Sequence, residues 1–556
     1  MSTARDPVFD SMRLSADGLV DAVHHPVIVV GAGTVGLVAA IDLAQYGIAT
    51  IVLDKGETVR AGSCAICYAK RSIEILDRLG CGEAVVREGV GWNVGKVFFK
   101  DRQVYSFNML SDAGHRRPAF VNLQQYCLEE ILVERARTTG RVDLRWRSRV
   151  VALDNAANEV RVVVDTSAGK RVLSCDWLIA CDGADSPVRH MLGLESEGQM
   201  VRDRFLVADV RMKADYPSER WFWFDPPFHP DHSTLLHRQG DDVWRIDFQL
   251  GWDANPEEEK RPENVLRRLQ AMMGERDFEL ERIEVHTFSC RRMDRFRHGR
   301  VLFAGDAAHQ VSPFGARGAN SGIQDSDNLV WKLHLVLGGK APQALLDTYS
   351  DERVAASNEN IRHATRSTDF ITPGSRVSRS FRDATLLLAE KYPFARRLVN
   401  SGRLSMPSIL DHSPLNTPDI DVFSAGLVPG SPVSDAPVVL NRELRWLLDC
   451  VGDRFNGLYF AHGMNELPVR TASGIAALTL DRIPVDTLVL VEPGNSVELP
   501  PGVMRLEDYE DFVVQRFDAM PGTFYLLRPD QHVCARWRTF DPTRVRRAVL
   551  RATGNV

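Results

Sequence analysis

The 556-residue sequence predicts an α/β fold in which a parallel-sheet domain is interrupted by a β-rich insertion and followed by a smaller α/β domain. Three observations support this prediction. Short apolar runs alternate with helical patterns from Pro26 onward. Strand-like alternation of aromatic and polar residues dominates residues 201–290. A proline-rich connector, residues 411–440, precedes a last segment, residues 441–556, in which strands and helices alternate again.

Length and composition limit the class of protein. A chain of 556 residues with 44% hydrophobic and 26% charged residues is typical of a globular protein with two or three domains. The net charge of -6 gives no indication of nucleic-acid or membrane binding. Residues 1–23 resemble a loose N-terminal arm and lack the apolar core of a signal peptide. Nine cysteines in this length do not suggest a disulfide scaffold, so we expect a cytoplasmic, reducing location.

The first structured segment reads as a strand–helix–strand unit. Residues 26–30 form a short apolar run, residues 37–46 follow a helical pattern, and residues 48–53 form a second strand. The first turn carries Gly31-x-Gly33-x-x-Gly36, and Asp54 lies 18 residues after the last glycine. This combination predicts a Rossmann-like dinucleotide site rather than a simple tight turn.

Each part of this motif has a physical role. Gly31 permits the tight turn, Gly33 lets backbone amides approach a pyrophosphate, and Gly36 lets the helix pack closely on the strand. The helix N-terminus attracts phosphate, and the acid after the second strand can accept hydrogen bonds from a ribose. The other predicted dinucleotide contacts of this unit are Thr34, Val35, Asp54 and Lys55.

Cys64 and Cys67 form a C-x-x-C pair shortly after the second strand. Such a pair allows an alternative interpretation, a flavin disulfide oxidoreductase. Those reductases need a second dinucleotide unit, and the sequence holds no second G-x-G-x-x-G. Two buried thiols that pack as small apolar groups are the favoured interpretation.

The rest of the first domain, residues 24–200, contains two further candidate segments. Gln124 opens a predicted helix. A buried strand at residues 177–180 runs into Asp182-Gly183, with Arg189 behind it. This junction could present a carboxylate and a guanidinium to a cofactor, although an ordinary turn would have the same residues.

The β-rich insertion, residues 201–290, carries alternating aromatic and polar side chains, which suit the wall of a ligand pocket. A half-buried sheet with one wet face would give the same alternation. The polar candidates on its strands are His237, Arg245, Asp247 and Gln249.

The chain returns to the first domain in residues 291–410. A strand at residues 300–304 leads into Gly305-Asp306, with His309 close behind. A glycine-rich loop, residues 313–322, then feeds a predicted helix at residues 323–337. A glycine loop at a helix N-terminus predicts a second anion site.

The three motifs together, Gly31-x-Gly33-x-x-Gly36, Asp182-Gly183 with Arg189, and Gly305-Asp306, resemble those of the single-component flavoprotein aromatic hydroxylases, which include p-hydroxybenzoate, phenol and 3-(3-hydroxyphenyl)propionate hydroxylases. The resemblance implies FAD as cofactor, NADH or NADPH as transient electron donor, and O2. It also implies that residues 441–556 form a thioredoxin-like domain, with a packing or dimer role.

The resemblance assigns roles to individual residues. Asp306 would hold the ribityl chain of FAD, Gln124 would lie near the cofactor, and Asp182 with Arg189 would serve FAD pyrophosphate and the nicotinamide donor. The predicted cofactor residues beyond the first motif are therefore Gln124, Asp182, Gly183, Arg189, Gly305, Asp306, Pro313, Gly315, Arg317, Gly318, Ala319 and Asn320.

The chemistry of phenol hydroxylation adds further expectations. Reduced flavin and O2 form a C4a-hydroperoxide that delivers one oxygen atom, and the site must exclude water and stabilise negative charge at the flavin pyrimidine. The loop amides, the dipole of the helix that follows them and Arg317 suit that task. Phenol deprotonation needs a base or hydrogen-bond acceptor. The candidates for catalysis and substrate binding are His237, Arg245, Asp247, Gln249, His309 and Pro313, with Arg245 expected to pair with a substrate carboxylate.

The sequence thus predicts an FAD-dependent monooxygenase that hydroxylates a phenolic compound, with small aromatic acids favoured. The same chemistry on a larger or non-phenolic substrate is one alternative. A flavin disulfide oxidoreductase and a non-catalytic flavin-binding protein are others. A homodimer is also expected from the resemblance.

Overall fold

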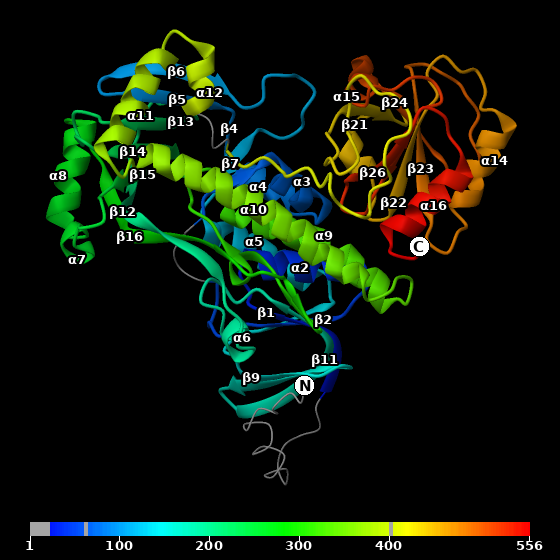
Figure 1. Ribbon diagram of the computed structural model, residues 1–556, viewed down its shortest axis with the longest axis horizontal. Coiled ribbons are helices and arrows are strands. Elements are labelled where there is room, and N and C mark those ends of the chain that lie inside the picture. Colours follow the sequence, from blue (N-terminus) through cyan, green and yellow to red (C-terminus); the bar gives the residue numbers. More distant parts are fainter. Residues whose placement is uncertain (1–22, 60–64, 400–403) are drawn as a thin grey trace.

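The computed structural model describes residues 23–59, 65–399 and 404–556, except the side chains of residues 201–203. The predicted N-terminal arm and Cys64 therefore lie outside the described residues, apart from Val23. Three lobes are visible in Figure 1: a first sheet with its helices, a second sheet at the upper left, and a C-terminal lobe coloured orange to red. The predicted α/β fold is confirmed.

The first sheet has the parallel order β17-β18-β11-β1-β2-β8 along its main path, with only β17 antiparallel there. Its centre is β1 (Val23–Val30), flanked by β11 (Gly169–Ala180) and β2 (Thr50–Leu53). Beyond these lie β8 (Val142–Arg145), β18 (Val301–Phe303) and β17 (Arg297–His298); β9 (Arg149–Asn155) and β10 (Val160–Thr166) extend β11.

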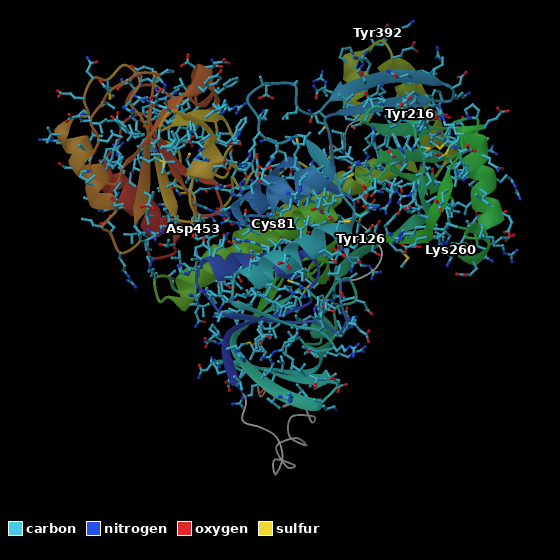
Figure 2. All side chains as sticks on the ribbon, turned by 180° about the vertical axis from the view of Figure 1, so that it is seen from behind. Cys81, Tyr126, Tyr216, Lys260, Tyr392 and Asp453 are labelled. Atoms are coloured by element: carbon cyan, nitrogen blue, oxygen red, sulfur yellow. The ribbon has the colours of Figure 1, made fainter. Side chains whose placement is uncertain are left out.

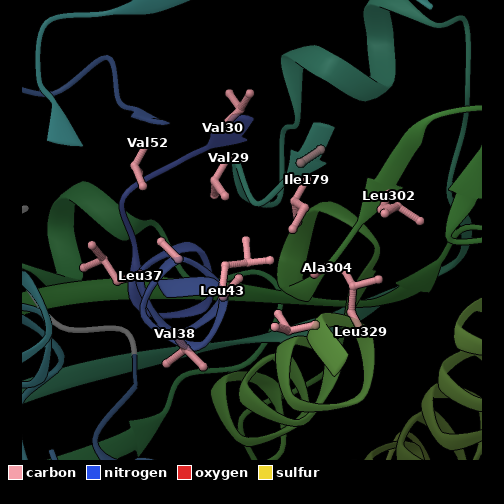
Figure 3. Packing of buried hydrophobic residues seen from close by; sticks show 14 of the residues in the cluster. Val29, Val30, Leu37, Val38, Leu43, Val52, Ile179, Leu302, Ala304 and Leu329 are labelled. Carbon is pink, nitrogen blue, oxygen red and sulfur yellow. The ribbon is translucent and has the colours of Figure 1, made fainter. Parts of the chain in front are cut away.

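Helices α2 (Thr34–Gln45) and α9 (Gly318–Leu337) cover one face of this sheet. Figure 3 shows Val29 and Ile179 of the strands facing Leu43 of α2 and Leu329 of α9. These side chains are fully buried, as expected for a parallel sheet covered by helices. Burial of this core fixes where the strands end, and the predicted site residues follow those ends.

The second sheet has the order β19-β16-β12-β15-β14-β13-β5-β6. It contains the long strands β12 (Glu197–Arg211) and β16 (Glu279–Arg292), and the shorter β13 (Arg220–Phe224), β14 (Ser233–Arg238), β15 (Val243–Gln249) and β19 (His309–Gln310). The strands β5 (Val94–Phe99) and β6 (Arg102–Asn108) complete it, because β5 pairs in parallel with β13. The predicted insertion, residues 201–290, thus supplies only part of this sheet, and the sequence alone did not reveal the long-range pairing of β5. The other domain boundaries stay predictions.

The two faces of the second sheet differ in character. One face is apolar and packs Leu206, Ile246 and Phe248 against α8 (Pro262–Met273). We call the opposite face the inner face. The strand registers place Arg220, His237, Arg245 and Asp247 together on it. Alternation along each strand therefore separates an apolar face from a polar face on one sheet.

A small sheet and several helices lie around the inner face. The small sheet contains β3 (Cys67–Ala69), β7 (Phe120–Asn122) and β4 (Val90–Trp92), in the order β3-β7-β4. The helices that follow the first motif are α3 (Lys70–Arg78), α4 (Gly82–Glu88) and α5 (Gln125–Thr138), and α6 (Pro187–Met191) follows β11. The helices α10 (Leu345–Ile371), α11 (Arg376–Ala389) and α12 (Pro393–Val399) come after α9, and Figure 1 shows α10 running beside it towards the second sheet.

The C-terminal lobe holds a mixed sheet in the order β21-β20-β24-β23-β22-β25-β26. Its strands are β20 (Pro437–Leu440), β21 (Glu443–Trp446), β22 (Phe455–Phe460), β23 (Val485–Val491), β24 (Met504–Asp508), β25 (Phe524–Leu527) and β26 (Val533–Trp537), and its main helices are α14 (Val469–Leu478) and α16 (Pro542–Ala552). The centre, β22 to β24, is parallel and β25–β26 is an antiparallel hairpin, as a thioredoxin-like fold requires. Within the described residues, no helix combines the length and apolar character needed to cross a bilayer.

A buried charge network joins the C-terminal lobe to α9 and α10. Arg528 donates to both oxygens of Glu352 at 2.7 and 3.1 Å and also contacts Asp530. Lys332 donates to Glu352 Oε2 at 2.7 Å. These four side chains are at most 3% exposed, and their two positive and two negative charges balance. In Figure 2, Asp453 lies on the side of the molecule where the two lobes meet; its carbonyl accepts a hydrogen bond from the Tyr46 hydroxyl at 2.8 Å.

Candidate active site

The first glycine loop is shaped by close backbone approaches. Gly31 has φ +106°, and a Cβ atom there would lie 2.3 Å from the carbonyl oxygen of Cys181. A Cβ atom on Gly36 would lie 2.0 Å from the carbonyl oxygen of Gly31. Both positions therefore exclude every residue but glycine, whereas a Cβ on Gly33, the N-cap of α2, would make only an ordinary contact of 3.6 Å with Glu129 Oε1.

Two carboxylates hold this loop. The two oxygens of Asp54 accept the amides of Ala32 and Gly56, each at 2.7 Å, so Asp54 fixes the turn as well as lying where a ribose is expected. Glu129 of α5 accepts the amide of Thr34 at 3.0 Å and its hydroxyl at 3.1 Å. The sequence reasoning missed Glu129, whose only signal is its place on the helix that Gln124 opens.

Glu129 occupies one amide of the first turn of α2 and leaves those of Val35 and Gly36, which have no intrahelical acceptor, for a phosphate. Burial raises the pKa of Glu129, against the hydrogen bonds from Gln125 and Thr34. Lys55 lies exposed beside the turn.

The Asp182 junction is held by hydrogen bonds within the protein. Asp182 accepts hydrogen bonds from the Ser186 hydroxyl at 2.6 Å and the Val188 amide at 2.9 Å, and so caps α6. Arg189 is buried and donates to the carbonyls of Ala307 and Ala184 at 2.8 and 2.9 Å. Both side chains position the loops after β11 and β18 through these protein partners, and their direct contact with the cofactor stays a prediction. Gly183 has φ +91°, which the turn requires.

Asp306 follows β18 through Gly305, which has φ +62°. The surface of Asp306 is accessible to solvent, but many protein atoms lie around its carboxyl. The resulting desolvation raises the pKa of this carboxyl, against the charge of His309. No hydrogen bond to Asp306 occurs among the described residues, in contrast to Asp54 and Asp182. A crowded, exposed carboxyl without a partner fits a hydroxyl-bearing ligand such as the ribityl chain.

The loop before α9 is rigid and strained. Gly315 has φ +117°, and Ala316 has φ +53°, a left-handed conformation that costs energy outside glycine. Asn320 clamps this loop to β3: its Oδ1 accepts the Ala69 amide at 2.8 Å, and its Nδ2 donates to the Cys67 carbonyl at 2.9 Å. The amides of Gly318, Ala319 and Asn320 begin α9 and have no intrahelical acceptor.

Arg317 lies at the N-cap of α9 and is 3% exposed. Its Nη1 donates to Asn360 of α10 at 2.6 Å. Burial lowers the pKa of Arg317 to about 10, against the charge of Glu359, so the guanidinium stays charged at neutral pH. Positive charge and a helix dipole thus converge on this loop, as charge stabilisation at a flavin pyrimidine would need.

His309 is part of a second buried network. Its Nε2 lies 2.7 Å from Asp325 Oδ2, which also accepts the amide of Gly305, while Arg353 donates to Asp325 Oδ1 at 2.6 Å. Burial opposes ionisation of Asp325, but the charges of His309 and Arg353 lower its pKa to about 2. Through Asp325, His309 helps to position the Gly305 turn, while its Nδ1 has no hydrogen-bond partner among the described residues; its role as a base stays a prediction. Arg353 and Asp325 were not predicted as site residues.

On the inner face, His237 and Asp247 form a dyad. His237 Nε2 lies 3.2 Å from Asp247 Oδ2, and its Nδ1 points to Cys67 Sγ at 4.0 Å. Burial and the charge of Arg220 lower the pKa of His237 to about 4, against the effect of Asp247. The ring is therefore neutral at pH 7, and with its proton on the Asp247 side, Nδ1 is an acceptor.

Arg220 was not predicted and, unlike Arg245 on the same face, makes no ion pair with an acid among the described residues. It is 3% exposed; its Nη1 donates to Cys67 Sγ at 3.9 Å, and its Nε has no hydrogen-bond partner. Burial lowers the pKa of Arg220, against the charges of Cys67 and Asp247. The period-two spacing from Phe222 and Phe224 was the signal that could have placed Arg220 on this face.

Arg245 and Gln249 also lie on the inner face, but their side chains are engaged. Arg245 is buried and bidentate with Asp209, with Nε–Oδ1 at 2.8 Å and Nη2–Oδ2 at 3.0 Å. Gln249 Oε1 accepts the Ser233 amide at 2.9 Å. This geometry contradicts the prediction that Arg245 pairs with a substrate carboxylate, because Asp209 already neutralises it in the wall of the sheet.

Gln124 and Pro313 take peripheral positions. Gln124 is the N-cap of α5, and its Oε1 accepts the Cys127 thiol at 3.8 Å. The neighbouring Gln125 reaches further into the site, since it bonds the Ala65 amide at 3.2 Å and Glu129 at 2.9 Å. Pro313 accepts the Ala316 amide at 2.9 Å and so closes the turn of the strained loop.

A cavity of about 1190 Å³ begins at this loop. Phe314, Gly315 and Arg317 line it, together with Phe222 and Phe224 of the inner face. It continues along α10 and under residues 404–414. The site therefore combines a nucleotide cleft, a charge-stabilising loop, a neutral histidine and a large aromatic-lined cavity.

Comparison with known proteins identifies the family. Residues 24–364 match the FAD binding domain family, which covers more than half of the chain, so the protein belongs to that family. Over 545 residues, the chain is 29% identical to a 3-(3-hydroxy-phenyl)propionate/3-hydroxycinnamic acid hydroxylase of Escherichia coli O81 (strain ED1a), covering 94% of each chain. The relative of the same description from Escherichia coli (strain K12) is 29% identical over 541 residues, again covering 94% of each chain.

Solved structures agree on the fold. The flavin-dependent monooxygenase PieE, in complex with FAD and substrate, is similar with a TM-score of 0.80 and 21% identity, covering 96% of this chain and 100% of PieE. Aklavinone-11 hydroxylase, in a complex with FAD and aklavinone, has a TM-score of 0.75 and 21% identity over 96% and 100% of the two chains. The protein is therefore an FAD-dependent monooxygenase of the aromatic hydroxylase type.

The residues present fit FAD. The glycine loop leaves amides for a pyrophosphate, Asp306 offers an unpartnered carboxyl, and the N-terminus of α9 offers amides and a nearby guanidinium. The alternative disulfide chemistry gains no support: Cys64 lies outside the described residues, and Cys67 is a buried free thiol that bonds Asn122 at 2.9 Å. Burial raises the pKa of Cys67, which disfavours the thiolate that disulfide exchange requires.

Proposed function

We propose that the protein hydroxylates a phenolic aromatic acid, consuming NAD(P)H and O2 and releasing NAD(P)+ and water. The observation that carries this proposal is the neutral His237–Asp247 dyad on the inner face. Its Nδ1 is directed towards Cys67 of β3. Asn320 binds the same strand and so connects it to the loop before α9, which we call the flavin loop. The names of the curated relatives support an aromatic acid as substrate.

FAD, when bound, supplies the redox chemistry: it accepts hydride from NAD(P)H and, once reduced, activates O2 for transfer of one oxygen atom. Val35, Gly36 and Asp306 would hold its phosphates and ribityl chain. The amides of Gly318 to Asn320 and the charge of Arg317 would stabilise negative charge at its pyrimidine end.

The dyad handles the substrate proton. His237 Nδ1 would accept the phenol hydroxyl proton, and Asp247 would orient the ring and stabilise the imidazolium that forms. A phenolate is more electron-rich than a phenol and so reacts more readily with electrophilic oxygen. Arg220 would stabilise the phenolate, since its guanidinium has no acid partner.

The proposal is tested with purified protein and a panel of phenolic acids. We expect bound FAD, NAD(P)H oxidation that rises with substrate, and a product heavier by one oxygen. If every acid gives NAD(P)H oxidation with release of hydrogen peroxide and no hydroxylated product, the proposal is contradicted. A cytoplasmic location and a homodimer belong to the same proposal, and size-exclusion chromatography with light scattering tests the latter.

A further inference from the structure

The cavity that begins at the flavin loop is larger than a single phenolic ring needs. We propose that it takes an aromatic acid of several fused or linked rings and that Arg362 and Arg397 bind its carboxylate. This inference rests on the proposed function and names the substrate class. The cavity volume, about 1190 Å³, exceeds the ~300–1,000 Å³ typical of sites for drug-sized ligands.

The lining at the flavin end is aromatic and flat enough for stacked rings. Phe222 and Phe224 project from β13, Phe107 from β6, Phe314 from the flavin loop and Phe370 from α10. Aromatic side chains bury large areas and stack with ring substrates. Two residues before Phe222 on the same face of β13 is Arg220, which pairs in register with His237 of the dyad, so the dyad lies on the face of the sheet that contributes Phe222 and Phe224 to the cavity.

The long dimension of the cavity follows α10. Lining residues run from Asp351 to Ile371, and 20 residues of helix extend about 30 Å. A single ring with a short side chain fills only one end of such a space. The opposite wall is fixed rather than loose: Ser405 donates its amide to the Gly315 carbonyl at 2.7 Å, and Ser413 donates to Glu352. A preformed space of this length favours an extended ligand, because little ordering is needed on binding.

Two charges in the wall are left for a ligand. Arg362 of α10 and Arg397 of α12 line the cavity and make no ion pair or hydrogen bond with the described residues. The other basic residues of the lining are engaged: Arg317 with Asn360 at 2.6 Å, Arg396 with the Ala389 carbonyl at 2.8 Å, His363 with Glu359 at 3.7 Å and His412 with Asp411 at 3.6 Å.

Glu359, three residues before Arg362, also lines the cavity and contacts His363 at 3.7 Å. The next acids of α10 in the lining, towards the start of the helix, are distant from Arg362. Asp351 precedes Arg362 by 11 residues, about 16 Å along the axis. Apart from Glu359, which contacts His363, the lining acids of α10 are Asp351 and Glu352, towards the C-terminal lobe, whereas the aromatic groups and the two unpaired guanidiniums lie towards the second sheet. A carboxylate on a ring system suits this arrangement better than a neutral or cationic ligand, because guanidinium and carboxylate pair through charge-assisted hydrogen bonds.

The test compares three compounds with the FAD-loaded enzyme: 3-(3-hydroxyphenyl)propionate, a hydroxyanthracene carboxylic acid, and the methyl ester of that acid. We expect the three-ring acid to have the lowest KM and the highest ratio of product formed to NAD(P)H consumed. The ester should have a KM about fivefold higher than the acid, the loss expected for partly exposed ion pairs.

Variants separate size from charge. Ala355→Trp, which fills the cavity midway along α10, should raise the KM for the three-ring acid at least tenfold more than that for the single-ring acid. The double variant Arg362→Met/Arg397→Met should raise the KM of the three-ring acid about fivefold and bring it to that of the ester. Arg366→Met is the matched control, since Arg366 is exposed on α10 outside the cavity lining and should change neither value.

The outcomes distinguish this inference from the proposed function. Efficient hydroxylation of the single-ring acid, with no binding or turnover of the three-ring acid, would overturn the inference and leave the function standing. An equal effect of Arg362→Met/Arg397→Met on acid and ester would also overturn it. If no phenolic compound is hydroxylated, both the inference and the proposed function are overturned.

Discussion

Two buried charged clusters in this protein have opposite patterns of pairing. In the network of Lys332, Glu352, Arg528 and Asp530, every side-chain polar atom has a partner. On the inner face, by contrast, Arg220 Nε and Asp247 Oδ1 are buried without a hydrogen bond. Unsatisfied buried polar groups are rare and costly in native proteins. We infer that the first cluster joins lobes and that the second is kept for a ligand.

The comparison predicts its largest effect in the closed network. Arg528→Met removes the cation between Glu352 and Asp530 and leaves buried negative charge, which should cost about 3–5 kcal/mol of unfolding free energy. Thermal and urea unfolding should show this loss. Arg454→Met is the control: its exposed pair with Asp486, at 3.9 Å, should contribute less than about 1 kcal/mol. Equal stability of the two variants would mean that the network does not join the lobes.

The next effect concerns turnover rather than stability. His237→Asn removes the proton acceptor but can still bond Asp247, so kcat should fall about a hundredfold while FAD content and melting temperature change little. His232→Asn, at the turn before β14, serves as the control and should keep the wild-type kcat. If His237→Asn instead lowers the melting temperature and leaves kcat intact, the dyad is structural.

Asp306 extends the comparison to the cofactor cleft, because this carboxyl also has no partner in the described chain. Asp306→Ala should weaken FAD binding about tenfold, as loss of a charge-assisted hydrogen bond requires. Fluorescence titration of the apoprotein measures the change. Asp185→Ala, an exposed acid after the same sheet, should leave the affinity for FAD unaltered. Unchanged FAD affinity in Asp306→Ala would remove the ribityl contact from the account.

The smallest effect is a pH dependence. His237 has a pKa of about 4 in the folded chain and 6.5 when unfolded, so the unfolded state binds the proton first. Stability should therefore fall as the pH drops from 6.5 towards 4, and His237→Asn should lessen this fall. The acid limb of kcat/KM due to His237 should lie near 4. A limb near 6.5 that disappears in His237→Asn would show that the histidine is not desolvated as described.

Local motifs were predictable from sequence because glycine and strand patterns reflect local sterics. Gly36 is required by a contact of 2.0 Å with the Gly31 carbonyl inside one strand–helix unit, and Gly31 has a positive φ that the turn itself imposes; only its close approach to Cys181, at 2.3 Å, comes from a distant segment. Side-chain pairing across the sheet was not predictable. Arg245 was predicted to bind a substrate carboxylate, but it forms an ion pair with Asp209, 36 residues earlier. Arg220 has no ion pair with an acid in the described chain, and its Nε has no hydrogen-bond partner. Such outcomes depend on register between distant strands, which the sequence does not encode locally.

The parallel contact of β5 with β13 shows the same limit, since 125 residues separate Val97 from Phe222, its partner in that register. Composition likewise gave no indication of the cavity, because its lining comes from strands, loops and the two helices α10 and α12, brought together only by folding. The family resemblance was enough to predict the reaction, whereas only the structure shows which charged side chains are paired and which are not.

The most direct test of the account is the fate of labelled dioxygen. Wild-type enzyme, NAD(P)H and a phenolic acid under ¹⁸O₂ should yield a product that contains one ¹⁸O atom, detected by mass spectrometry, and His237→Asn should form it about a hundredfold more slowly with FAD still bound. Product without ¹⁸O, or labelled product at the wild-type rate from His237→Asn, would contradict the central claim that the inner-face dyad serves a flavin-dependent hydroxylation.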